Sequence, residues 1–345
     1  MSFALSVLDL SPIPQGSTGP EALQNTLDLA RHVDDLGYVR YWLAEHHNLP
    51  TIASSAPEVM IAMVASVTKN LRVGAGGIML PNHAPLKVAE TFKVLRALFP
   101  DRIDLGIGRA PGTDPTTAAA LRRSADAMHA EDFPQQFAEL LAFGGRGFDP
   151  GHPYANIQAI PVEVDLPPVW LLGSSGYSAQ ASGEMGFGYS FASHFSPSDP
   201  APPMLAYREN FRPSDDFPVP HAMAAAAVIC GEDDEHAEYL AASAKLSWVR
   251  LRMGQPTPIP SPEEAIKYQY SPMEERIGEA FLQIQTVGGP DTVRQKLETL
   301  AERTRADEIM VTSNIFSHEE RKRSFDRIAT VFDLTSRKAE TSVVS

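Results

Sequence analysis

Hydrophobic and polar positions follow two alternating patterns from one end of this chain to the other. Short runs of apolar, β-branched and aromatic residues, typical of buried strands, are each followed by stretches in which apolar residues recur every three or four positions, typical of helices. In Glu21–Leu36 the apolar residues have this helical spacing, and Gly37 is the expected C-terminal cap. The alternation predicts a parallel sheet with crossover helices.

Eight strand–helix units can be counted along the chain. The predicted strands are Phe3–Leu10, Tyr38–Ala44, Leu71–Ile78, Arg102–Gly108, Val169–Gly173, Gly188–Ala192, His221–Ile229 and Glu308–Thr312. Helices are predicted between them, among others at Glu21–Leu36, Glu58–Thr68, Pro85–Leu98, Pro290–Arg303 and Glu319–Phe332. Eight units favour a closed (β/α)₈ barrel, the TIM barrel of the α/β class, over a doubly wound sheet. The segment Asp9–Gly16 also lacks the G-x-G-x-x-G pattern that follows the first strand of a dinucleotide-binding sheet.

Two connections are too long for simple crossovers. Ala110–Pro168 and Gly231–Gly289 are therefore predicted to be insertions after strands four and seven, serving as lids or supports. We expect one domain over residues 1–337 and a flexible polar tail over residues 338–345.

Composition and charge narrow the class of protein. The chain has 345 residues, 43% hydrophobic and 21% charged, with no apolar run long enough to span a membrane, so we expect a soluble enzyme. The amino terminus has no basic leader, which favours the cytoplasm. A net charge of −14 argues against nucleic acid or an anionic membrane as partner. The single cysteine, Cys230, cannot form an intrachain disulfide or a thiolate metal site by itself.

The second strand ends in three titratable side chains. Tyr41-Trp-Leu-Ala is followed directly by Glu45, His46 and His47, which places them at the carboxyl end of a strand, where parallel α/β enzymes hold their catalytic groups. Because side chains alternate along a strand, Trp42 and His46 share one face. The alternative is a capped strand with a structural histidine.

Glycines mark the third strand end. Gly76 and Gly77 indicate a bulge, an unusual peptide geometry, or a flat ligand against bare backbone. His83 follows a Pro-Asn turn and is expected to be a loop or cap residue, because no metal-ligand spacing accompanies it. We predict no metal site.

The fourth and fifth strand ends carry groups suited to an anion. Arg109 follows two glycines, and its planar guanidinium could bind a phosphate, although a surface ion pair is the alternative. Ser174–Ser178 joins the fifth strand to a helix and offers hydroxyls and free N–H groups at a helix start, where an ordinary serine cap is the alternative. The G-x-S-x-G pattern of serine hydrolases is missing here. At the sixth strand end His194 could line a pocket wall, while Phe191 is as well explained as core.

Together these segments resemble the bacterial luciferase-like flavin monooxygenases, and most closely a subgroup of uncharacterised bacterial oxidoreductases. The resemblance covers nearly the whole chain. Its most specific parts are Tyr41–Asn48, Gly76–His83, Arg102–Gly112 and Trp170–Ser175.

The resemblance implies a TIM barrel that uses reduced FMN, supplied by a separate reductase, and dioxygen to oxygenate a small organic substrate. It implies a homodimer and assigns His46 as the active-site histidine. It places a non-prolyl cis peptide at Gly76 and Gly77 against the flavin ring. It assigns Arg109 and the turn Ser174, Ser175, Gly176, Tyr177 and Ser178 to the FMN phosphate. The pocket for the substrate is then expected to include Asp9, Ser11, Trp42, Glu45 and His194.

One position departs from the family pattern. Where luciferase itself has a reactive cysteine beside the flavin, this chain has Gly108, so we do not predict light emission. Three other functions are compatible with the sequence: hydride transfer with a deazaflavin coenzyme, flavin binding without catalysis, and metal-dependent hydrolysis by His46, His47 and His83 with a carboxylate.

Overall fold

The predicted barrel is confirmed in the computed structural model, which describes residues 3–123 and 132–335. Eight parallel strands form a ring in the order β1, β2, β3, β4, β5, β6, β7, β9, and β9 closes it by pairing with β1. The strands of the ring are β1 (Ala4–Asp9), β2 (Arg40–Leu43), β3 (Arg72–Met79), β4 (Ile103–Gly108), β5 (Val169–Gly173), β6 (Gly188–Phe191), β7 (Ala222–Cys230) and β9 (Glu308–Thr312). Each matches a predicted strand.

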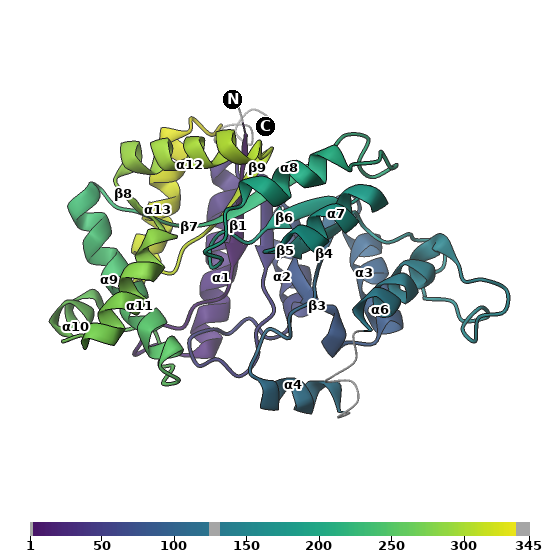
Figure 1. The fold of residues 1–345 in the computed structure, drawn as a ribbon, viewed down its shortest axis with the longest axis horizontal. Helices are drawn as coiled ribbons and strands as arrows, with labels where there is room; N and C mark the ends of the chain where they lie inside the picture. Colours follow the sequence, from purple (N-terminus) through teal and green to yellow (C-terminus); the bar gives the residue numbers. More distant parts are fainter. Residues whose placement is uncertain (1–2, 124–131, 336–345) are drawn as a thin grey trace, which may run out of the picture.

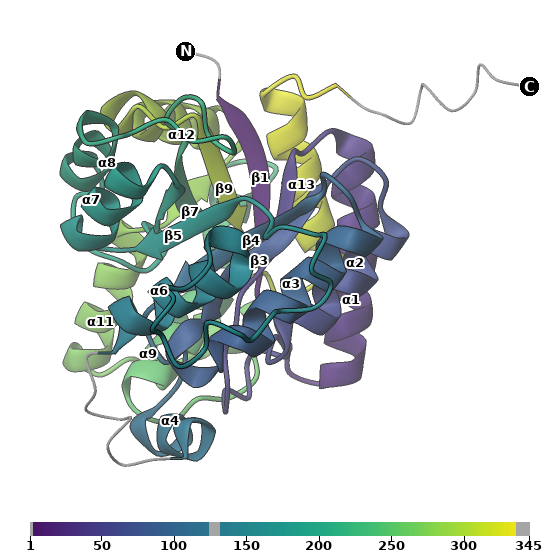
Figure 2. The same cartoon turned by 90° about the vertical axis from the view of Figure 1, so that its right-hand side faces the viewer.

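Helices surround this ring, and the predicted ones are present (Figures 1 and 2). Figure 2 shows α1, α2 and α3 along one flank. Thr18 caps α1 in a capping box with Glu21, and Gly37 ends it at φ 96°, as its position predicted. None of the described helices is long and apolar enough to cross a membrane. The helices of the strand–helix units are α1 (Gly19–Leu36), α2 (Pro57–Val67), α3 (Pro85–Leu98), α7 (Gly176–Met185), α8 (Ala201–Glu209), α12 (Pro290–Thr304) and α13 (His318–Val331).

Both long connections are insertions, as expected. After β4 come α4 (Pro115–Arg122), α6 (Phe133–Leu141) and the π-helix η2 (Ala142–Arg146); after β7 come α9 (Asp234–Arg252), α10 (Pro262–Lys267) and α11 (Pro272–Gln283). The second insertion also contains a short strand that the sequence did not reveal, β8 (Thr286–Gly288), which pairs with β7 outside the ring. The strands run downward in Figure 1, and α4 lies beyond their carboxyl ends. The predicted tail, 338–345, lies outside the described residues.

Because side chains alternate along each strand, one set packs against the surrounding helices and the other fills the barrel interior. In β2, Tyr41 and Leu43 pack under the helices, whereas Trp42 belongs to the interior cluster. The Trp42 and Trp170 rings meet edge to face at 5.3 Å and fill the middle of the barrel. Trp42 is fully buried, and its Nε1 donates to Asp104 Oδ2 at 3.1 Å, toward the amino end. Trp42 therefore closes the barrel below the carboxyl ends of the strands, and its place in the substrate pocket stays a prediction.

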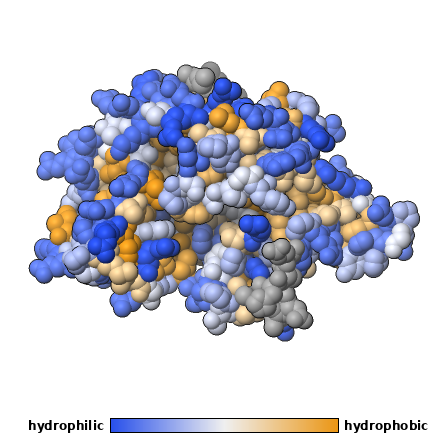
Figure 3. Space-filling view, viewed as in Figure 1, coloured by the Kyte–Doolittle hydropathy of each residue, from blue (hydrophilic) through white to orange (hydrophobic). Residues whose placement is uncertain are grey.

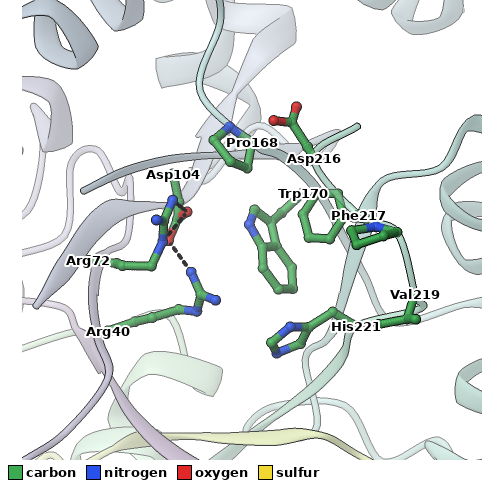
Figure 4. Close-up of a pocket in the computed structure, with 10 residues that line it drawn as sticks. Arg40, Arg72, Asp104, Pro168, Trp170, Asp216, Phe217, Val219 and His221 are labelled. Atoms are coloured by element: carbon green, nitrogen blue, oxygen red, sulfur yellow. Dashed lines mark hydrogen bonds and ion pairs between the residues drawn. The ribbon is translucent and has the colours of Figure 1, made fainter. Parts of the chain in front are cut away.

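Charged groups at the amino end of the barrel neutralise one another. The buried Arg40 guanidinium donates to Asp104 Oδ2 at 2.7 Å and to Glu308 Oε2 at 3.0 Å, and Arg72 also binds Asp104. A cavity of about 240 Å³ opens beside this network, with Trp170 on its wall (Figure 4). Because the arginines there are already paired with carboxylates, the cavity lacks a free positive charge of the kind that an anion needs.

Burial raises the pKa of Glu308, but the charge of Arg40 and the hydrogen bond from His221 bring it to about 2. The carboxylate therefore stabilises the fold above its ordinary pKa of 4.5, and this contribution is lost as the pH falls toward 2. The network therefore has a structural role at the amino end of the barrel. The predicted site lies at the opposite end, where the strands have their carboxyl ends.

We predict that Arg40→Met lowers the free energy of unfolding by about 3–5 kcal/mol, because it leaves two buried carboxylates with fewer partners. Urea denaturation at pH 7 measures the change. Arg294→Met, which removes an exposed pair with Glu298, is the control and should cost less than about 1 kcal/mol. A loss below about 1 kcal/mol for Arg40→Met would contradict the structural role of this network.

Candidate active site

Two histidines follow strands on opposite sides of the mouth of the barrel, the rim formed by the carboxyl ends of its strands. His46 follows β2 and His194 follows β6, and these strands are four places apart in a ring of eight, that is, on opposite sides. His46 continues the inward face of Trp42 and Ala44. The Nδ1 atom of each histidine is buried and has no hydrogen-bond partner within the described part of the chain. Unpartnered buried nitrogens at the carboxyl end of a barrel mark a place where a ligand is expected.

Both imidazoles are held in their neutral form. Burial lowers the pKa of His46, and the neighbouring Glu45 only partly opposes this. Burial, assisted by His46, lowers the pKa of His194 to about 4. Neutral imidazoles at pH 7 have both a lone pair and an N–H group, so they can accept or donate a proton.

Further polar atoms of the mouth were missed by the sequence analysis. Ser193 Oγ, beside His194, is buried without a partner among the described residues, as are polar side-chain atoms of Thr312, Ser313 and Asn314. Thr312 is the last residue of β9, and Ser313 and Asn314 follow it directly. The rule that polar residues after a strand form the active face of a barrel could have found them.

The glycine-rich end of β3 has both of the backbone irregularities that were expected. The peptide bond between Gly76 and Gly77 is cis, and the pairing of β3 with β4 shifts between Ala75 and Ile78. A Cβ at Gly76 would lie 2.8 Å from Leu8 Cδ1, and one at Gly77 would lie 2.8 Å from the carbonyl oxygen of Gly106. Barrel packing alone therefore requires glycine at position 77, where the clash is with backbone, and leaves little room for a side chain at position 76; contact with a flavin stays a prediction.

A similar packing argument applies to Gly108. A Cβ there would lie 2.7 Å from Met79 Sδ. A side chain such as cysteine would force Met79 to move, which is the physical reason that glycine fits this position.

Arg109 and the turn after β5 lie together. The Arg109 guanidinium carbon is 5.7 Å from the centre of the Tyr177 ring. Arg109 forms no ion pair with any described residue, and Ser174–Tyr177 is exposed. Ser175, at the N-cap of α7, makes no capping bond through its side chain, while the Ser178 hydroxyl donates to its carbonyl at 3.4 Å. An unpaired cation beside an uncapped helix start is an arrangement that favours anions such as phosphate, and the assignment of these residues to a cofactor phosphate stays a prediction.

Asp9 and Ser11 do not line a pocket, which corrects that expectation. Asp9 is fully buried on the outer side of β1, where it accepts hydrogen bonds from Arg321 at 2.7 Å, Tyr41 at 2.5 Å and Thr26 at 2.7 Å. Ser11 is also fully buried, and its hydroxyl contacts Thr26 at 2.7 Å. The group joins the strand end to helices α1 and α13, so it is structural.

Glu45 is likewise fully buried, and it binds loop residues of the mouth. Its Oε1 is 2.9 Å from Nε2 of both His47 and His83, and its Oε2 accepts from the Met79 N–H at 2.8 Å. His47 and His83 therefore bind a carboxylate oxygen, and His46 is not part of this group. Within residues 3–123 and 132–335 the three histidines do not form the common ligand set that a metal-dependent hydrolase needs.

Comparison with known proteins identifies related chains over almost the full length. A profile of the luciferase-like monooxygenases matches residues 2–308. Uncharacterized protein YvbT of Bacillus subtilis is 47% identical over 95% of this chain and 96% of that protein. A luciferase-like monooxygenase of Escherichia coli K12 is 43% identical over 94% of this chain and 96% of that protein. The crystal structure of apo-MsnO8 has a TM-score of 0.87 at 37% identity, covering 97% of this chain and 99% of the other.

Two further similarities have names that state a reaction. N-acetyl-S-alkylcysteine monooxygenase of Bacillus subtilis is 40% identical over 194 residues, which is 54% of this chain and 56% of that protein. The oxygenating constituent of 3,6-diketocamphane monooxygenase from Pseudomonas putida, solved in complex with FMN, has a TM-score of 0.66 and covers 100% of this chain and 99% of the other. At 17% identity the second similarity shows the fold alone.

We predict that His194 stays neutral from pH 5 to pH 8, because burial opposes its charged form. Ring-nitrogen NMR shifts measure the titration. In His46→Ala the pKa of His194 should rise, because the variant removes the neighbouring imidazole and reduces the burial of His194. The control is His32→Ala, which changes a histidine between α1 and α13 and should leave the pKa of His194 unchanged. Titration of His194 near pH 6.5 in the unsubstituted protein would contradict the buried position.

Proposed function

The chain belongs to the luciferase-like monooxygenase family, and on that premise we propose that it binds reduced FMN and uses dioxygen to oxygenate a small organic substrate at the mouth of its barrel. One observation carries the cofactor assignment. Arg109, unpaired among the described residues, lies beside the uncapped start of α7 and so forms a phosphate site at the same barrel end as His46 and His194.

The residues present fit this cofactor. The phosphate of FMN would be held by Arg109, Ser174, Ser175, Ser178 and the N–H groups of Gly176 and Tyr177. All lie at or beside a helix start, and all except the half-buried Ser178 are exposed. Gly76 has no side chain beside Leu8 and Trp42 of the interior cluster, and Gly77 has none beside the backbone of β4. The FMN named in the 3,6-diketocamphane monooxygenase structure supports the same assignment at the level of the fold.

Bound reduced FMN would supply the electrons that activate dioxygen, and the chain's own residues would handle protons and exclude water. His46, neutral and directed into the mouth, would hold or transfer a proton at a ring nitrogen. His194 would contact the substrate from the opposite wall. The packed Trp42 and Trp170 rings close the barrel interior below the site, and α4 lies beyond the carboxyl ends of the strands.

We also propose the partners that such chemistry needs. A separate flavin reductase would supply the reduced cofactor in the cytoplasm.

Two copies of the chain would associate, and exposed apolar side chains on the neighbouring helices α2 and α3 support this: Val59, Met63, Val94 and Leu98. On the face shown in Figure 3, hydrophilic residues lie mostly along the edge, and more hydrophobic residues lie toward the middle. For the substrate, the relative named for N-acetyl-S-alkylcysteine supports a small organic molecule.

We predict that Arg109→Ala weakens FMN about 10- to 100-fold, the effect expected when charge-assisted hydrogen bonds are lost. Quenching of flavin fluorescence measures the dissociation constant. Riboflavin, which lacks the phosphate, should bind both proteins equally, and Arg294→Ala is the control for loss of an exposed charge. Equal FMN binding by Arg109→Ala would refute the phosphate assignment, and an absorption spectrum typical of deazaflavin on purified protein would refute the choice of cofactor.

We predict that His46→Ala keeps its FMN affinity and loses oxygenation of substrate by about 10²- to 10⁴-fold, the contribution expected of a general acid or base. Oxygen uptake coupled to product formation, followed by mass spectrometry across a metabolite panel, measures this. His32→Ala, which changes a histidine between α1 and α13, should behave as the unsubstituted protein does. Full turnover by His46→Ala would remove this residue from the mechanism.

A further inference from the structure

Glu45 is a buried carboxylate on which three chain segments converge. It follows β2 directly and precedes His46. Its Oε2 accepts the N–H of Met79, at the end of the strand that contains Gly76 and Gly77, and its Oε1 lies 2.9 Å from both the His47 and the His83 imidazole. A carboxylate offers about four lone-pair positions, so it can satisfy three donors at once.

The segment that contains Arg109 is attached to the same group. The N–H of His47 donates to the Gly112 carbonyl at 3.2 Å, and the Thr113 hydroxyl donates to the His47 carbonyl at 2.8 Å. Asn82, next to His83, donates to the Pro111 carbonyl at 2.9 Å. The ends of β2, β3 and β4 are therefore joined by hydrogen bonds that centre on Glu45.

We propose that Glu45 is a positioning residue, which fixes His46 relative to the backbone of Gly76 and Gly77 and so sets the geometry in which the flavin ring and the reacting proton meet. The inference rests on the proposed function and deepens it. Glu45 itself is shut off from solvent. It therefore acts through His46 and the β3 backbone, and not by touching the substrate.

Charge contributes to this link. Burial raises the pKa of Glu45, but the hydrogen bond and charge of His83 and the bond from His47 bring it below its ordinary value. The hydrogen bond to Glu45 raises the pKa of His83, and Glu58 adds to this. The charged His83 donor is present below its raised pKa and is lost above it. Flavin affinity should therefore fall as the pH rises through that value.

Glu45→Gln is the sharpest test, because glutamine has one oxygen acceptor for three donors and its NH₂ group would face an N–H group. The matched control is Glu308→Gln at the amino end, another fully buried carboxylate with an imidazole partner, His221, at 3.0 Å. Both variants should lose thermal stability. Glu45→Gln alone should weaken FMN and riboflavin equally, by about 10-fold, and lower kcat/KM about 10- to 100-fold.

Two further readouts separate positioning from general destabilisation. In ¹⁵N spectra without flavin, the Met79 amide resonance should move in Glu45→Gln and keep its position in Glu308→Gln. His83→Gln retains a donor but cannot titrate, so it should remove the alkaline fall in flavin affinity, whereas His32→Gln should retain it.

Several outcomes would overturn the inference. These are flavin binding and turnover by Glu45→Gln within twofold of the unsubstituted protein, equal losses in Glu308→Gln, or an unmoved Met79 resonance. If the unsubstituted protein does not bind FMN, the proposed function fails, and the Met79 resonance still decides whether Glu45 holds the strand ends together.

Discussion

Closure of the barrel by pairing of β9 with β1 is the constraint on which the site depends. Because the ring is closed and every strand in it is parallel, all the carboxyl ends lie on one rim, and β2 stands opposite β6. His46 and His194 are thereby brought to opposite walls of one mouth, although 148 positions separate them in the sequence. Arg109 and Tyr177, from β4 and the turn after β5, come together for the same reason.

Charged side chains have different roles at the two ends of the barrel. At the amino end Arg40 and Arg72 are balanced by Asp104 and Glu308, so the charges stabilise the fold and leave little attraction for a ligand. At the mouth, Arg109 has no ion-pair partner in the described residues, and the imidazoles of His46 and His194 are neutral. An anion and a proton-transfer step therefore fit the mouth better than the cavity at the amino end.

The sequence predicted every strand of the ring, because buried parallel strands are apolar and their helices amphipathic. The same property made the faces of β1 indistinguishable: Val7 and Leu8 are both apolar, yet one packs under helices and the other inside the barrel. Asp9 was therefore placed on the wrong side. The bond between Glu45 and His83 depends on how two loops fold, which periodicity does not reveal. Thr312–Asn314 could have been found, since these polar residues lie at the carboxyl end of a predicted strand.

The central claim is that the FMN phosphate binds between Arg109 and the start of α7. A crystal structure of the protein with FMN tests this most directly, because arginine side chains lie at both ends of the barrel. We predict phosphate oxygens within hydrogen-bonding distance of the Arg109 guanidinium and of the Gly176 and Tyr177 N–H groups. Phosphate bound at the amino-end cavity beside Arg40 and Arg72, with Arg109 free, would contradict the account.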